Sequence, residues 1–176
     1  MARELFLLTN KPVLYVCNVD EKSALTGNHY TNRVTGILEK ENEQYLIVAA
    51  RIESEIAELE SFEERQIFLE SMGLEESGVS RLIKAAFKLL DLETYFTAGP
   101  MEVKAWTYLK GTKAPQAAGL IHSDFEHGFI RAEVIKFKDY MHYGSEAACR
   151  EAGKMAVEGK NYVVQDGDIM HFLFSR

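Results

Sequence analysis

Two apolar runs decide the fold of the first half: residues 13–18, VLYVCN, followed directly by VDE, and residues 45–50, YLIVAA. Runs of this length and composition are typical of buried parallel strands. Residues 30–43, YTNRVTGILEKENE, lie between the two runs and have helical spacing, so the sequence predicts one β-α-β unit. Asn18 and Glu21 then stand at the carboxyl end of the first strand, where α/β proteins bind ligands.

The second strand is followed by acidic amphipathic patterns. They predict helices over approximately Glu53–Met72 and Gly78–Leu90, with Gly73 as the stop signal of the first. Two strands form only a small sheet, which would leave apolar edges and faces open to solvent. We therefore expect either further strands from a larger domain or self-association through this truncated sheet.

From Thr94 the sequence is rich in β-strand patterns. Strands are predicted at 94–98 (TYFTA), 102–109 (EVKAWTYL), 129–137 (FIRAEVIKF), 160–164 (KNYVV) and 168–174 (DIMHFLF), and helices at 114–125 and 145–159. Asp166-Gly167-Asp168 predicts a hairpin turn between the last two strands. The order β-β-α-β-α-β-β indicates a ubiquitin-like β-grasp module. The fold class is thus α/β followed by α+β, with domains at 1–93 and 94–176.

Charge and composition limit the function classes. Residues 1–93 carry 10 Lys/Arg against 17 Asp/Glu, whereas residues 94–176 carry 10 of each, so the net charge of -7 belongs to the first half. That half would repel a polyanion such as nucleic acid. Cys17 and Cys149 provide neither a disulfide framework nor a metal-ligand spacing. No apolar run approaches the roughly 18 residues that span a membrane, and we expect a cytoplasmic protein without membrane contact.

Several long segments resemble one family, the Obg-like ATPases, which are the YchF branch of the translation-factor GTPases. The segments are KPVLYVCNVDE (11–21), EIAELESFEER (55–65), LETYFTAGPMEVKAWTYLKGTKAPQAAGLIHSDFEHGFIRAEVI (92–135) and EAGKMAVEGKNYVVQDGDIMHFLF (151–174). The resemblance covers nearly the whole chain. It implies a P-loop G domain, an inserted helical hairpin and a C-terminal TGS domain in a ribosome-associated protein.

The phosphate-binding motifs of such a protein are absent from this sequence. It contains neither G-x-x-x-x-G-K-[ST] nor Asp-x-x-Gly. The resemblance therefore implies that residues 1–93 are the second half of a G domain and that residues 94–176 are the TGS domain. ATP or GTP with Mg²⁺ is the ligand implied for the intact protein. No cofactor is expected on this chain alone, which should be inactive as an enzyme.

The resemblance also gives Asn-x-x-Glu a role in reading the nucleotide base. GTPases have Asn-Lys-x-Asp here, and their aspartate accepts hydrogen bonds from guanine; this sequence has Glu21 in its place and Val19 in place of the lysine. Guanine thereby loses a fitted acceptor, and adenine is no longer excluded. Asn18 would support the site, and Ala50 belongs to the implied base-contact loop 49–51. The alternative is that Asn18 caps a helix and Glu21 favours a helix dipole.

Residues 122–129, HSDFEHGF, bring four potential metal ligands close together in sequence. They are His122, Asp124, Glu126 and His127. The segment joins a helix to a strand, and no distant residue completes a tetrahedral or octahedral ligand set. We predict a structural turn in which Asp124 caps backbone donors, and no metal site.

The strand EVKAWTYLK alternates basic and aromatic residues. With a period of two, Lys104, Trp106, Tyr108 and Lys110 share one face. Such a face suits single-stranded RNA, because rings stack on bases and lysines neutralise phosphates. The alternative is that Trp106 faces the core of its own module.

Two functions from different classes remain open at this point. In the first, the chain supplies the base-recognition element and the TGS domain of a ribosome-associated nucleotide-hydrolysing protein. In the second, it is a stand-alone, non-catalytic TGS-type module that binds RNA or protein. A ubiquitin-like sulfur carrier would need a C-terminal Gly-Gly, whereas this sequence ends in FLFSR.

Overall fold

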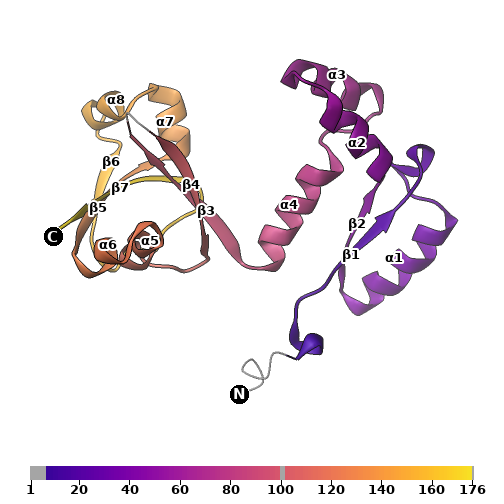
Figure 1. The fold of residues 1–176 in the computed structure, drawn as a ribbon, viewed down its shortest axis with the longest axis horizontal. Helices are drawn as coiled ribbons and strands as arrows, with labels where there is room; N and C mark the ends of the chain where they lie inside the picture. The colour runs from indigo at the N-terminus through magenta and orange to yellow at the C-terminus, as the bar shows by residue number, and fades with distance from the viewer. Residues whose placement is uncertain (1–6, 100–101, 176) are drawn as a thin grey trace. The chain divides into compact units, whose positions relative to one another are not determined.

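The structure, a computed structural model, describes residues 7–99 and 102–175. The chain forms two compact units that divide between Leu90 and Asp91 (Figure 1). The boundary expected from the sequence lay after residue 93. The division falls slightly earlier because β3, the first strand of the second unit, begins at Leu92.

The first unit contains a two-stranded parallel sheet with helices. Its elements are a 3-10 turn (Leu8–Asn10), β1 (Leu14–Asn18), a 3-10 turn (Glu21–Ser23), α1 (His29–Glu41), β2 (Gln44–Val48), α2 (Ala50–Glu58), α3 (Phe62–Ser71) and α4 (Gly78–Leu89). β1 and β2 pair in parallel, and Asn18 lies opposite Val48 at their carboxyl ends. α1 begins at a capping box between Asn28 and Thr31. The predicted β-α-β unit is confirmed.

The single helix predicted over Glu53–Met72 is wrong, because the chain interrupts it after Glu58. Ser61 accepts a hydrogen bond from the Glu64 N–H, and the Glu64 carboxylate accepts one from the Ser61 N–H, at 3.1 Å each. This capping box starts α3 as a new helix. The Arg65 guanidinium also donates to the carbonyl of Leu59, the residue that ends α2.

The core of the first unit lies between its helices and the loop after β1. It consists of Ala24, Ala49, Ile52, Ile56 and Leu69. Gly73, at φ +69°, ends α3 as predicted, since this backbone conformation favours glycine. Tyr15 and Val16 on β1 remain exposed. Self-association through this small sheet stays a prediction.

The second unit is built around a five-stranded mixed sheet. Its elements are β3 (Leu92–Ala98), β4 (Val103–Leu109), α5 (Ala114–Ile121), α6 (Ser123–His127), β5 (Phe129–Lys136), α7 (Phe137–Tyr143), α8 (Glu146–Glu151), β6 (Met155–Glu158) and β7 (Asp168–Phe174). The strand order is β4-β3-β7-β5-β6. Only β3 and β7 are parallel, and the other pairs are antiparallel. This is the β-grasp arrangement expected from the sequence.

Two clusters of buried side chains hold the sheet to its helices. On one side, Tyr95 and Tyr108 pack with the alanines of α5, and the Tyr95 hydroxyl donates to the carbonyl of Ala117 at 2.8 Å. The small alanine side chains let α5 approach the sheet closely. A second cluster contains Ile135 and Cys149, which joins α8 to β5.

Two sequence expectations for the C-terminal segment are wrong. Residues 160–164 form no strand, and only Val163 makes an isolated bridge, to Lys113. The expected hairpin at 166–168 is therefore absent, and the N–H of Gly167 donates instead to the carbonyl of Thr94. The helix expected over 145–159 ends at Glu151, and residues 155–158 form β6, which pairs with β5. α7 was not predicted.

The carboxylate of Asp168, at the start of β7, is fully buried. It accepts hydrogen bonds from Lys136 Nζ (2.7 Å), the Tyr162 hydroxyl (2.6 Å) and the Gln165 N–H (2.9 Å). Burial, followed by the bond to Asp168, raises the pKa of Tyr162 to about 12, so this tyrosine remains a donor at neutral pH. These contacts hold the irregular segment 160–167 against the sheet.

We expect Asp168→Asn to lower the free energy of unfolding of the second unit by about 3 kcal/mol, because Lys136 then loses its buried counter-ion. Chemical denaturation of the chain, followed by circular dichroism, measures the change. Glu151→Gln, at an exposed position, is the matched control. A loss equal to that of the control would show that the Asp168 network does not stabilise the unit.

Candidate functional site

The carboxyl ends of β1 and β2 form the best-organised polar site of the first unit. Asn18 ends β1, and its Oδ1 accepts a hydrogen bond from the N–H of Ala50, the first residue of α2, at 3.1 Å. The N–H of Val19 donates to the carbonyl of Val48 at 2.9 Å. The two loops that follow the parallel strands are therefore joined through Asn18.

The contact of Asn18 bears on the capping interpretation that the sequence left open. Asn18 does cap a helix, but the helix is α2, 32 positions along the chain, rather than the turn that follows β1. The short turn after β1 is capped by Asp20, which accepts from the Ser23 N–H at 2.9 Å. Sequence reasoning missed Asp20, although an aspartate directly before a Glu-Lys-Ser turn is a typical N-cap.

The side chains of Val19 and Glu21 lie in different environments. Val19 is half-buried and packs against the core cluster of Ala24, Ala49 and Ile52. Glu21 begins the short turn and its side chain is exposed. Its carboxylate has no hydrogen-bond or ion-pair partner within residues 7–99 and 102–175. Glu21 is thus open to a ligand at the carboxyl edge of the sheet, whereas Val19 positions its loop.

Glu53 and Arg81 join α4 to α2 and to β2 beside this edge. The Glu53 carboxylate accepts from the N–H groups of Gly78 (2.7 Å) and Val79 (3.0 Å) at the start of α4. The Arg81 guanidinium donates to the carbonyl of Ile47 in β2 at 2.9 Å. A Cβ at position 78 would lie 2.8 Å from the Glu53 carboxylate and 2.9 Å from a methyl group of Val48, so any larger residue would have to displace these side chains. The sequence pattern contained no signal for this long-range cap.

The proposed RNA face on β4 is only partly available. Tyr108 is 3% exposed and its hydroxyl donates to Glu93 at 3.0 Å, so its expected place on an open surface is wrong. Trp106 is half-buried against the core cluster, and its indole N–H donates to Thr97. Large aromatic rings gain the most free energy from burial, and α5 covers this face of β4. The aromatic residues belong to the core.

The two lysines at the ends of this face remain accessible. Lys104 is exposed and its ammonium lies 4.1 Å from the centre of the Trp106 ring. Lys110 is also exposed and pairs with Glu93 at 3.3 Å. An anionic partner could therefore meet two separated cations, but no continuous stacking surface.

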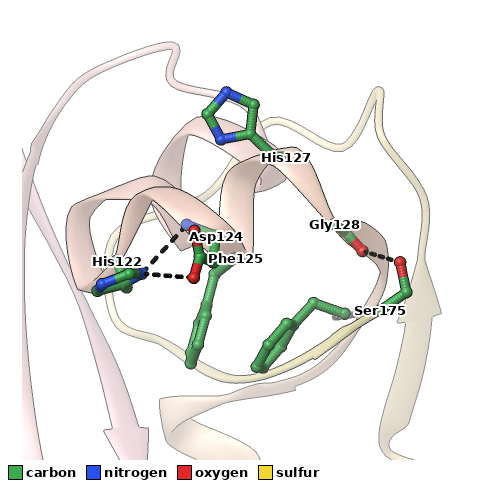
Figure 2. A pocket seen from close by; sticks show the side chains of 7 residues that line it. His122, Asp124, Phe125, His127, Gly128 and Ser175 are labelled. Atoms are coloured by element: carbon green, nitrogen blue, oxygen red, sulfur yellow. Dashed lines mark hydrogen bonds and ion pairs between the residues drawn. The ribbon is translucent and has the colours of Figure 1, made fainter.

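The segment 122–129 lines an open hollow of about 800 Å³ (Figure 2). The imidazole Nδ1 of His122 accepts from the N–H of Asp124 at 3.2 Å, so His122 is the backbone cap and not Asp124 as predicted. The Nδ1 of His127 lies 2.8 Å from the carbonyl oxygen of Ser123. In the described part of the chain, no group of three or more His, Cys, Asp or Glu side chains could hold a metal ion.

The floor of this hollow is aromatic. The rings of Phe125 and Phe174 stack with their centres 3.9 Å apart. Figure 2 shows His122 and His127 apart from each other, one before α6 and one at its last residue, and the Nδ1 atom of each ring contacts a nearby backbone group. The segment is therefore a structural turn.

Among the described helices, none is long and apolar enough to cross a membrane.

We expect Asn18→Ala to destabilise the first unit by about 1 kcal/mol, because α2 loses the acceptor at its first N–H. Asn18→Asp is the matched control, since it keeps the oxygen at that position. Denaturation and amide exchange of Ala50 measure the effect. If the alanine and aspartate variants lose equal protection at Ala50, the side chain does not join the two loops in solution.

Comparison with known proteins places these features in one family. Residues 92–175 match the model of the YchF GTPase C-terminal region, described as a protein of unknown function (DUF933). The chain is 54% identical over 177 residues to the "Ribosome-binding ATPase YchF" of Bacillus subtilis, covering 99% of this chain and 48% of the relative. It is 46% identical over 172 residues to "Obg-like ATPase 1" of Rattus norvegicus, covering 96% and 43%.

A solved structure extends the likeness to three dimensions. The YchF GTPase of Schizosaccharomyces pombe superposes with a TM-score of 0.87 at 35% identity, covering 98% of this chain and 46% of that one. The chain spans about half the length of the curated relatives it matches. The matches cover at least 96% of this chain, and the chain belongs to the YchF family of Obg-like ATPases.

Proposed function

We propose that this chain is the base-recognition and TGS portion of a ribosome-associated protein that binds ATP or GTP. The observation that carries the proposal is the join between Asn18 and Ala50, which holds together the two loops at the carboxyl edge of β1 and β2. Nucleotide sites in open α/β sheets lie at this edge. The proposal also draws on relatives named as ribosome-binding ATPases.

Each residue of the site has a separate part in the proposed recognition. Asn18 uses its oxygen on Ala50 and thereby holds the two loops of the site together. Glu21 supplies the exposed carboxylate that would accept from the purine. The exocyclic amine of adenine is a donor, whereas guanine presents two donors to an acceptor at this place. The longer side chain of Glu21 fits the guanine pair less well than an aspartate would.

Hydrolysis needs parts that this sequence does not contain. Phosphoryl transfer depends on a cradle of backbone N–H groups, a lysine and Mg²⁺ to stabilise the transferring phosphate. The sequence has no G-x-x-x-x-G-K-[ST] motif. The Mg²⁺ and phosphate contacts of the intact protein are therefore assigned to polypeptide outside these 176 residues.

We expect the chain alone to turn over neither ATP nor GTP, and to bind both weakly. In a full-length protein carrying this sequence, Glu21→Asp should favour GTP over ATP by about tenfold, because the shorter carboxylate regains the guanine contact. Competition between labelled nucleotides measures the preference. Lys22→Arg, a neighbouring change that keeps the charge, is the control. An unchanged ratio would place base selection elsewhere, and turnover by the isolated chain that Glu21→Ala abolishes would contradict the assignment.

The second candidate function is a non-catalytic contact of the second unit with RNA or protein. It is favoured by the exposure of Lys104 and Lys110 in a unit whose residues 94–176 carry equal numbers of Lys/Arg and Asp/Glu. An anionic partner would then meet local positive charge without a strong opposing field from its own unit.

Reversing both charges, Lys104→Glu with Lys110→Glu, should weaken co-sedimentation with ribosomes by about tenfold and reduce its dependence on salt. The double reversal of the exposed Lys138 and Lys160 is the matched control. Thermal melts of both variants establish that they fold, since Lys110 also pairs with Glu93. Equal co-sedimentation by the two double variants would exclude β4 as the ribosome contact.

A further inference from the structure

β4 is an edge strand with an open hydrogen-bonding side. It stands at one end of the strand order β4-β3-β7-β5-β6. β3 forms backbone hydrogen bonds with every second residue of β4, the even-numbered ones. The bonds from Gly99 N–H to the Glu102 carbonyl (2.9 Å) and from Lys110 N–H to the Asp91 carbonyl (2.7 Å), at the two ends of the strand pair, fix this alternation. In an antiparallel pair the intervening residues direct their N–H and C=O groups away from the partner.

The intervening residues are the odd-numbered ones of β4. They are Val103, Ala105, Thr107 and Leu109, and all four are exposed. Val103 is 73% exposed and Leu109 is 63% exposed. Their side chains lie on the face opposite to Tyr108. The Leu109 carbonyl already accepts hydrogen bonds from Thr112, but the outward-directed backbone groups of Val103, Ala105 and Thr107 remain available beside a largely apolar stripe. Such an edge is a template for another strand.

The usual protections of an edge strand are missing here. The segment 103–109 contains no proline, and its pairing with β3 runs without a register shift. Lys104 could block an approaching strand, but its ammonium lies over the Trp106 ring on the inner face. Proteins ordinarily cover or interrupt an edge of this length and composition.

The sequence of β4 complements itself in one antiparallel register. When two copies of β4 are aligned so that Val103 faces Leu109 and Ala105 faces Thr107, every outward-directed residue meets an outward-directed residue of the other copy. Trp106 then lies on the two-fold axis. In this register all four outward-directed residues of one copy face those of the other, which is the largest overlap that two copies of the strand can reach.

The same register pairs opposite charges just beyond the strand. Glu102 of one copy stands opposite Lys110 of the other, and this occurs twice because of the symmetry. Lys110 is 68% exposed, and Glu102 has no ion-pair partner within the part of the chain that the structure describes. Opposite charges in facing positions favour a strand pair, whereas like charges oppose it.

We propose that β4 is a self-association surface, on which a second copy of this chain adds its own β4 in antiparallel register centred on Trp106. The two five-stranded sheets then become continuous across a two-fold axis. This surface is independent of β1 and β2 in the first unit and of the proposed nucleotide site. An extended segment of another protein could pair with the same backbone groups. Cross-linking between cysteines placed at positions 103 and 109 distinguishes that case from a second copy.

The first test measures the dimerisation constant of the 176-residue chain by sedimentation equilibrium. Val103→Asp should weaken the dimer by about tenfold or more, because two aspartates enter the interface. Val157→Asp is the matched control, since Val157 is 60% exposed on β6, the opposite edge of the same sheet. Val16→Asp reports on association through the first unit. A chain that stays monomeric to about 100 μM, or a dimer lost only with Val16→Asp, would overturn the proposal.

The second test examines the register. Val103→Cys and Leu109→Cys are made in separate copies and then mixed under mild oxidation. We expect a disulfide-linked heterodimer in the mixture and little in either variant alone, because residue 103 meets residue 109 and lies about 20 Å from its own counterpart. The unmodified chain corrects for Cys17 and Cys149. A mixture that cross-links no better than the single variants would refute the register, and would leave β4 to a foreign segment or to none.

Discussion

The buried carboxylate of Asp168 determines how the second unit closes. It lies at the first residue of β7, the central strand, and receives donors from β5 and from the irregular segment before β7. Without those donors a fully buried carboxylate would be costly, so the segment 160–167 must pass close to it. β7 is thereby placed between β3 and β5, and its parallel contact with β3 completes the β-grasp sheet.

The first unit relies on a related device, in which polar side chains hold the starts of helices. Asn18 takes the first N–H of α2, and Glu53 takes two N–H groups at the start of α4. Both contacts join segments more than 20 residues apart and both lie beside β2. Because helix starts carry unpaired donors, a single carbonyl or carboxylate can fix a helix against the sheet. The carboxyl edge that would receive a nucleotide is organised in this way.

The sites proposed for this chain lie at strand ends and edges rather than in an enclosed cavity. The candidate base-recognition residues follow β1, and the proposed self-association surface is the open side of β4. Strands keep backbone groups and side chains in a regular order, so a partner that pairs with them gains both at once. In the hollow beside α6, in contrast, the Nδ1 atoms of His122 and His127 contact nearby backbone groups.

Much of the architecture could be predicted from the sequence, because local periodicity decides it. The apolar runs 13–18 and 45–50 became β1 and β2, and the strand patterns at 94–98, 102–109, 129–137 and 168–174 became β3, β4, β5 and β7. Gly73 ended its helix because glycine tolerates a positive φ. The family resemblance was also present in these segments, since it depends on residue order alone.

Contacts between distant residues decided the rest. MAVE reads as the end of a helix, yet it becomes β6 because β5 offers it a partner, whereas 160–164 has strand composition but is bound to Asp168 and Lys113 instead. A period of two placed Lys104, Trp106 and Tyr108 on one face, but it could not say which face α5 would cover. Burial of Tyr108 settled that choice, because large rings gain more from leaving water than the small residues opposite.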